Sequence, residues 1–213
     1  MIHADLKKSP KISEITSPRL LILAYDVFSR NTTWFTNNRP GENPCWYDNV
    51  ELWKICTASA SATTFFPPYE LPYNSNEKIP HIDGGVSANN PELSAIAHAL
   101  LMENKKDKNQ LNVNEIAVLS IGTGNTTRPY SYQQVKGWGT LGWVKRLPDI
   151  FMNPSAQNSE SICAQILESL GGDKNYLRLN FDLNARFKKD RVPGRMKILE
   201  ENPYNQFIFE KTG

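Results

Sequence analysis

The residues best suited to chemistry lie in the stretch 81–91, where Asp83 is followed directly by Gly84 and Gly85. A short apolar run precedes this aspartate, and an Asn-Pro pair then opens an amphipathic helical pattern. Glycine has no Cβ, so it can adopt φ > 0 and let another chain segment approach closely. Such a turn could hold the Asp83 carboxylate as a general base that deprotonates a serine hydroxyl. The alternative is a turn aspartate that hydrogen-bonds its own backbone, because Asp-Gly is among the commonest turn dipeptides.

Metal and nucleotide sites fit the sequence less well. The three histidines, His3, His81 and His98, lack metal-ligand spacing, and the three cysteines form neither a metal pattern nor a disulfide framework. Residues 137–142 match G-x-G-x-x-G, but a dinucleotide fingerprint follows an apolar strand and the residues before this match are mostly polar. We therefore expect no metal and no cofactor, and interpret residues 137–142 as a packing segment or loop. We also expect His81 to point away from Asp83, as a packing or surface histidine.

The sequence contains no recognisable nucleophile. A serine hydrolase of the Ser-His-Asp type usually carries its serine in a Gly-x-Ser-x-Gly turn, and no two glycines here are four positions apart. Ser59 and Ser61 stand in a run of small residues at the predicted end of a helix, where packing explains them.

The apolar runs predict the strands of an α/β sheet flanked by helices. The continuous run 19–28 has the length of a strand that is covered on both faces, and residues 32–36 could form its hairpin return. Residues 116–121 predict a second buried strand, and residues 176–181 alternate like a more exposed one. The expected sheet core consists of Leu21, Ile22, Leu23, Val118, Leu119 and Ile121.

Three helices are predicted from caps and spacing. Asp48 to Glu51 resembles a capping box in front of the first helix. Asn90 can cap the second helix, which has Pro91 as its first residue and the buried stripe Leu93, Ile96, Ala97, Leu100 and Leu101. The third helix spans residues 157–170 and turns inward Ile162, Cys163, Ile166, Leu167 and Leu170. Residues 129–150 show no assignable period.

Composition indicates one domain and excludes some partners. With 24 basic and 22 acidic residues in 213, the chain has no electrostatic case for binding nucleic acid. No apolar run approaches the roughly 20 residues of a spanning helix, and the polar start has no export signal, so we expect a cytoplasmic protein. Residues 1–18 predict a tail, 19–182 the domain, and 183–213 an extension of that domain or a second tail.

Several motifs, taken in order, resemble the patatin-like lipid acyl hydrolases. They are the strand-like run 20–26 that ends in an aspartate, the small-residue helix 55–62 with Phe-Pro-Pro after it, Asp83-Gly84-Gly85 with Asn89, Asn90 and Pro91 behind it, Leu-Ser-Ile-Gly-Thr-Gly at 119–124, and the segments 138–143 and 175–179. Each motif is short, but their order is specific, and the resemblance runs from about residue 13 to about residue 182.

The resemblance implies a three-layer α/β fold and hydrolysis of phospholipid or galactolipid acyl esters through a serine. Asp83 would be the carboxylate of a Ser–Asp dyad that takes and returns the proton, with no histidine, metal or cofactor. The family's glycine-rich oxyanion loop and Gly-x-Ser-x-Gly elbow do not occur in this sequence. We therefore expect the carboxyl-terminal half of the domain, inactive alone, with the serine outside this chain. A separately encoded amino-terminal half and a mis-started reading frame are the two sources of that serine left open. The alternative is a non-catalytic remnant that binds lipid or protein.

Overall fold

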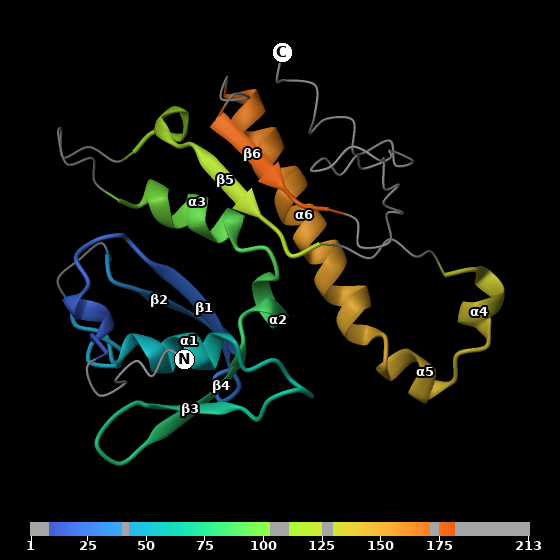
Figure 1. The fold of residues 1–213 in the computed structure, drawn as a ribbon, viewed down its shortest axis with the longest axis horizontal. Coiled ribbons are helices and arrows are strands. Elements are labelled where there is room, and N and C mark those ends of the chain that lie inside the picture. Colours follow the sequence, from blue (N-terminus) through green and yellow to red (C-terminus); the bar gives the residue numbers. More distant parts are fainter. Residues whose placement is uncertain (1–8, 40–42, 103–110, 125–129, 171–174, 182–213) are drawn as a thin grey trace, which may run out of the picture.

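The computed structural model of the chain describes residues 9–39, 43–102, 111–124, 130–170 and 175–181. Its strands are β1 (Leu21–Asp26), β2 (Asn31–Thr36), β3 (Tyr69–Pro72), β4 (Lys78–Asp83), β5 (Val118–Ile121) and β6 (Tyr176–Leu179). Its α-helices are α1 (Leu52–Ser59), α2 (Gly85–Ala88), α3 (Glu92–Leu100), α4 (Tyr132–Lys136), α5 (Thr140–Val144) and α6 (Leu147–Ser169), with short 3-10 turns at Ile12–Glu14 and Val113–Glu115. The predicted α/β class is confirmed (Figure 1).

The strands form two sheets. The larger has the order β2-β1-β4-β3 with antiparallel neighbours, and the smaller pairs β5 with β6 in parallel. The strand predicted at 19–28 and its hairpin return are confirmed as β1 and β2. On the other side of β1, β4 pairs so that Asp83 lies opposite Ala24. The register therefore brings the end of β4 beside the middle of β1.

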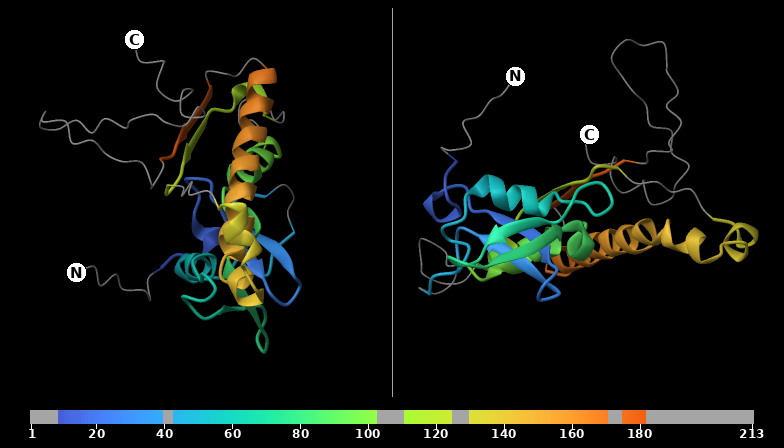
Figure 2. Two further views of the ribbon diagram at one scale, coloured as in Figure 1. Left: turned by 90° about the vertical axis from the view of Figure 1, so that its right-hand side faces the viewer. Right: turned by 90° about the horizontal axis from the view of Figure 1, so that it is seen from below.

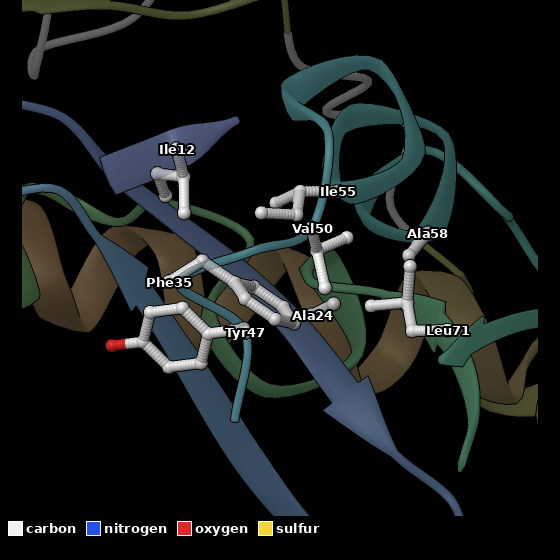
Figure 3. Packing of buried hydrophobic residues seen from close by; sticks show 8 residues of the cluster. All are labelled: Ile12, Ala24, Phe35, Tyr47, Val50, Ile55, Ala58 and Leu71. Carbon is white, nitrogen blue, oxygen red and sulfur yellow. The ribbon is translucent and has the colours of Figure 1, made fainter. Parts of the chain in front are cut away.

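The main core lies between the larger sheet and α1 (Figure 3). Its buried residues are Ile12, Ala24, Phe35, Tyr47, Val50, Ile55, Ala58 and Leu71. Ile12 is fully buried, and its N–H donates to the carbonyl of Val50 at 3.1 Å. Residues 9–18 therefore pack onto the domain, although their polarity indicated a tail, because one isoleucine among polar neighbours was enough to anchor them.

A second, smaller cluster joins α3 and α6 to the smaller sheet, around Ile96, Cys163 and Leu167. Val118 and Tyr176 pack against it, but Leu119 and Ile121 point the other way and are 60% and 71% exposed. The prediction that these two residues belong to the sheet core is wrong, because the described residues cover only one face of this sheet.

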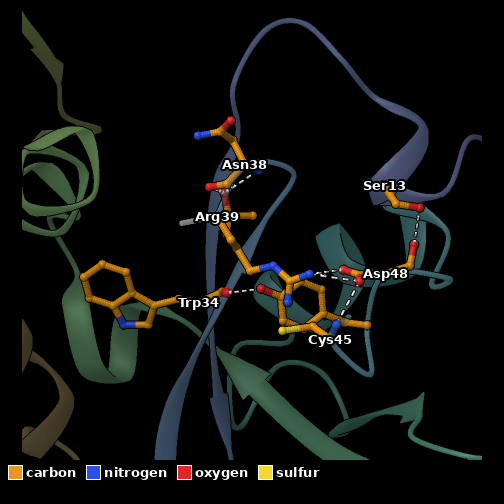
Figure 4. Close-up of polar contacts among 8 residues, drawn as sticks. Ser13, Trp34, Asn38, Arg39, Cys45 and Asp48 are labelled. Carbon is orange, nitrogen blue, oxygen red and sulfur yellow. Dashed lines mark hydrogen bonds and ion pairs between the residues drawn. The ribbon is translucent and has the colours of Figure 1, made fainter. Parts of the chain in front are cut away.

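Three helix predictions need correction. Asp48 does not cap α1, because the N-cap of this helix is Glu51. The Asp48 carboxylate instead binds Arg39 and the Cys45 N–H (Figure 4). On α3 the buried stripe is rotated, so that Glu92 and His98 are buried whereas Leu93 and Leu101 are exposed. In α6, Cys163 and Leu167 are buried as predicted, but Ile162 and Leu170 are exposed.

The unassigned segment is helical. Figure 2 shows α6 carrying α4 and α5 away from the larger sheet. The G-x-G-x-x-G letters join α4 to α5, so a helix precedes them where a dinucleotide site would need a strand. None of the helices in the described part of the chain is long and apolar enough to cross a bilayer.

Candidate functional site

Backbone bonds from the end of α1 fix the position of Asp83. Its N–H donates to the carbonyl of Ser61 at 3.0 Å, and the next N–H, of Gly84, donates to the carbonyl of Ser59 at 3.2 Å. These bonds continue β4 along the chain that leaves α1. The aspartate is therefore held on two sides, by β1 in the sheet and by the small-residue run 57–62.

Gly84 is required by close contact with β1. A Cβ on this residue would lie 2.1 Å from the carbonyl oxygen of Leu23, a distance that side chains do not tolerate. Gly84 has φ −63° and ψ −23°, so its backbone is right-handed. The expectation of φ > 0 is wrong here, whereas the expectation of a close approach is confirmed. Ser59 Oγ donates to the same Leu23 oxygen at 2.7 Å.

The Asp83 side chain is half-buried and has one oxygen engaged. Oδ1 accepts a hydrogen bond from the Gly85 N–H at 2.6 Å. No group in the described ranges donates to Oδ2. A Cβ on Gly85 would lie 3.0 Å from Oδ1, 3.0 Å from Met152 Cε and 3.3 Å from Asn89 Oδ1. The carboxylate thus lies beside α2, and the α6 residue Met152 reaches the same neighbourhood.

This geometry suits proton transfer. The Gly85 N–H orients the carboxylate through Oδ1, and no group in the described ranges occupies Oδ2, which is free to accept a hydrogen bond. The nearby serines serve other purposes: Ser59 bonds Leu23, and Ser61 Oγ donates to the Thr57 carbonyl at 2.7 Å. Both hydroxyls are thus bonded to backbone carbonyls.

His81 is a packing histidine, as expected. It is fully buried between Phe35 and Trp46, and its Nε2 lies 3.2 Å from Thr33 Oγ1. Burial lowers its pKa. The reason for its separation from Asp83 differs from the expected one, because residues two apart in a strand share a face. Both ring nitrogens of His81 are engaged elsewhere, Nε2 with Thr33 Oγ1 and Nδ1 with the Ile79 carbonyl at 3.0 Å.

A second polar cluster, which sequence reasoning missed, is buried between α3, α6 and the smaller sheet. Tyr176 OH donates to Glu92 Oε2 at 3.2 Å, while Glu92 Oε1 is buried without a partner among the described residues. Arg178 Nη1 donates to Ser120 Oγ at 2.6 Å, and its Nε lies 3.5 Å from Glu160 Oε2. Burial raises the pKa of Tyr176 and of Glu160. An arginine within an alternating strand pattern was the signal that could have revealed this cluster.

The thiol in this second cluster is unreactive. Cys163 is fully buried, and burial together with the charge of Glu92 raises its pKa to about 11. A thiol is nucleophilic as the thiolate, so Cys163 does not replace the serine that the sequence lacks. The second cluster is structural.

Comparison with known proteins agrees with the motifs. A family model described as patatin-like phospholipase matches residues 9–96. Patatin-like protein 3 of Arabidopsis thaliana is 31% identical over 194 residues, which is 84% of this chain and 44% of the relative. Patatin-like protein 1 of Oryza sativa subsp. indica is 29% identical over 77% of this chain and 44% of its own. Probable inactive patatin-3-Kuras 1 of Solanum tuberosum is 24% identical over 74% and 45%. The chain spans less than half the length of these curated relatives.

Proposed function

Because the chain belongs to the patatin-like phospholipase family, we propose that it takes part in the hydrolysis of lipid acyl esters, with Asp83 as general base of a Ser–Asp dyad. The observation that carries this proposal is the Asp83 carboxylate, anchored through Oδ1 by the Gly85 N–H with Oδ2 left open. The serine would come from a segment outside these 213 residues, since the sequence has no Gly-x-Ser-x-Gly.

In the proposed reaction Asp83 Oδ2 accepts the proton of the serine hydroxyl as the serine oxygen attacks the ester carbonyl carbon. The proton then passes to the departing alcohol as the carbonyl–oxygen ester bond breaks. Water hydrolyses the acyl-serine by the same exchange and releases the fatty acid. The close packing of Gly84 against the Leu23 backbone supports this role, because it fixes the position of the neighbouring Asp83. A general base must stay within hydrogen-bond reach of the proton it removes.

The smaller sheet supports the proposal of a second segment. Leu119, Ile121, Leu177 and Leu179 alternate on one face of β5 and β6 and are 44–71% exposed. Parallel strands are normally covered on both faces. We therefore propose that the serine-bearing segment, encoded in the same protein or separately, packs on this bare face, so that its arrival completes the domain and the dyad together.

A fusion protein tests the proposal. Joining this chain to the part of Patatin-like protein 3 outside the matched region should give hydrolysis of p-nitrophenyl acyl esters, whereas the 213 residues alone should give none. Asp83→Asn in the fusion should lower kcat by about 10²–10⁴-fold, the usual contribution of a general base. The matched control is Glu70→Gln, an exposed carboxylate that pairs with Lys78 at 3.6 Å on the same sheet and should leave kcat unchanged.

The competing function is a non-catalytic module that binds lipid or a partner protein. The bare face of the smaller sheet is the observation that favours it. The same fusion separates the two functions. A folded fusion that turns over no ester, or whose turnover is indifferent to Asp83→Asn, would establish the binding module and reject the dyad. Turnover by the isolated chain that Asp83→Asn abolishes would reject the assignment of the serine to another segment.

A further inference from the structure

The segment 130–151, called the helical arm below, precedes the part of α6 that packs on α2, where Asn89 Nδ2 donates to the Met152 carbonyl at 3.4 Å. It contains α4, α5 and the first turns of α6 (Figure 1). The far part of α6 is anchored by Cys163 and Leu167, both fully buried. At 1.5 Å per residue, the 23 residues of α6 span about 35 Å. The helix therefore carries the arm well beyond its anchor in the smaller cluster.

The arm keeps its shape through its own contacts. The Trp138 ring packs edge-on against Tyr130, with centroids 4.8 Å apart, and against Trp143, with centroids 5.1 Å apart. The Arg146 guanidinium lies over Trp138 at 4.3 Å and donates to the Gly142 carbonyl at 2.9 Å. These contacts fix α5 against the end of α4 without help from either sheet.

The arm nevertheless exposes large apolar side chains. Leu141 is 77% and Val144 is 55% exposed, and they lie one helical turn apart on the same side of α5. Tyr132 on α4 and Phe151 on α6 are 72% and 66% exposed. Large exposed apolar side chains gathered on one short segment indicate a surface that binds a partner.

Charge identifies the kind of partner. Residues 130–156 contain three cations, Lys136, Lys145 and Arg146, and one acid, Asp149, and both lysines are exposed. Protein–protein interfaces are depleted in lysine. Surfaces that lie in the membrane interface instead combine tryptophan and tyrosine with aliphatic residues and basic side chains. The composition of the arm matches a lipid surface better than a protein partner.

We propose that the helical arm docks the chain on the surface of a phospholipid bilayer. Leu141 and Val144 enter the boundary between headgroups and acyl chains, the aromatic rings lie at headgroup level, and Lys136 and Lys145 pair with lipid phosphates. The inference rests on the proposed function only for the choice of phospholipid as the ligand. Docking would bring an acyl-ester substrate to the α6 side of Asp83, where Met152 also lies.

Vesicle flotation with the full 213-residue chain tests the arm, because aggregated protein does not float. The chain should float with phosphatidylcholine vesicles and more strongly with vesicles that also contain phosphatidylserine. Leu141→Ser with Val144→Ser should weaken the partition coefficient at least about tenfold, since burying one such side chain is worth more than a factor of ten. Lys136→Gln with Lys145→Gln should weaken binding about tenfold or more on the anionic vesicles and little on phosphatidylcholine, at about 1 kcal/mol per cation.

The matched control is Val27→Ser with Phe28→Ser, which removes two exposed apolar side chains from the β1–β2 turn, on neither the arm nor the smaller sheet, and should leave flotation unchanged. Failure of the unaltered chain to float, or equal loss in both serine pairs, overturns the proposal. So does a change of size-exclusion mass in the arm pair without a change in flotation, which would mean self-association. Flotation needs no catalysis, so it can succeed when the fusion is inactive, and it can fail when the fusion hydrolyses a soluble ester.

Discussion

The hairpin region, residues 9–83, and the crossover region, residues 85–181, differ in how fully they bury their apolar side chains. In the hairpin region Phe35 is fully buried, with its ring 5.1 Å from Tyr47 and 5.8 Å from Trp46. In the crossover region the buried cluster is small, and no described residue covers the outer face of the smaller sheet. The hairpin region thus has a well-packed core between its sheet and α1, whereas the smaller sheet of the crossover region has a core on one face only.

The difference follows from sheet type. An antiparallel sheet can keep one face in water, so β1 to β4 need only α1 and the residues around Ile12 to cover them. The parallel pair β5 and β6 is normally covered on both faces, and α3 with α6 covers one. Asp83 lies where the two regions meet, at the end of β4 and the start of α2. The densely packed hairpin region therefore presents the carboxylate, and under the proposed function the exposed face of the smaller sheet is where the serine-bearing segment would pack.

The largest effect is expected from the core of the hairpin region. Phe35→Ala should lower the free energy of unfolding by about 3–5 kcal/mol, because it leaves a cavity among packed aromatic rings. Phe28→Ala, at an 82% exposed residue in the β1–β2 turn, should change it by less than about 0.5 kcal/mol. Urea unfolding followed by near-ultraviolet circular dichroism measures both. Similar costs at the two positions would mean that this region is not packed as described.

The same glycine-to-alanine substitution should change stability in opposite directions in the two regions. Gly84→Ala should destabilise the chain by about 1–3 kcal/mol or more, because the new Cβ meets the Leu23 backbone, which cannot move without shifting β1. Gly137→Ala in the arm, with φ −81° and its nearest contact at 3.6 Å, should stabilise by about 0.4–1 kcal/mol through the unfolded chain. Opposite signs in thermal unfolding are the expected result, and equal signs would contradict the close approach at Gly84.

Local pattern was enough to predict β1, β2 and the position of Asp83. The apolar run before Asp26 and the Asp-Gly-Gly sequence are signals carried by neighbouring residues. The family resemblance added the carboxylate's proposed role, which no single spacing supplies. What failed were statements about the far side of an element. The apolar run that includes Leu119 and Ile121 predicts a strand, but it gives no information about which faces of that strand other elements cover.

The buried polar cluster around Glu92 and Tyr176 was not predicted for a similar reason, because its contacts join residues that are distant in sequence. Glu92 and His98 are not among the residues of the predicted buried stripe of α3, yet both are buried: the Tyr176 hydroxyl donates to Glu92, and Thr36 Oγ1 lies 3.0 Å from His98 Nε2. Both partners are more than 60 residues away in sequence. Asp48 failed as a cap for a similar reason, since Arg39 and the Cys45 N–H compete for its carboxylate. Partners that are distant in sequence determine whether such side chains are buried and what they bind, and a short stretch of sequence does not include those partners.

The buried cluster of the crossover region should respond in opposite directions to changes at the two ends of one hydrogen bond. Tyr176→Phe removes a donor from a buried carboxylate and should cost about 1–3 kcal/mol. Glu92→Gln removes a charge whose Oε1 has no partner in the described ranges and which repels Glu160, so it should stabilise by about 0.5–1.5 kcal/mol. Thermal unfolding of the two variants checks this, and destabilisation by Glu92→Gln would show that the charge is needed.

The smallest effect is a difference in pH dependence between the two regions. Burial lowers the pKa of His81 and of His98 below 6.5, so the unfolded chain binds more protons than the folded chain below that pH. His98 Nε2 lies 3.0 Å from Thr36 Oγ1 of β2, so the hairpin region and the adjoining α3 should lose stability as pH falls through 6.5. Burial raises the pKa of Glu160 above 4.5, so the folded chain keeps its proton at a higher pH, and the α6 part of the crossover region should gain stability as pH falls toward 4.5. Each group contributes at most about 1.4 kcal/mol per pH unit.

Native-state hydrogen exchange at pH 7.5 and pH 5.5, corrected for the intrinsic exchange rates, resolves the two responses. Amides of β1 and β4 should lose protection at the lower pH, while those of α6 and β6 should keep or gain it. His81→Gln should flatten the response of the hairpin region alone, and Glu160→Gln that of the crossover region alone. If either substitution altered the pH response of both regions equally, they would unfold as one unit. The contrast in burial between them would then have no counterpart in their stability.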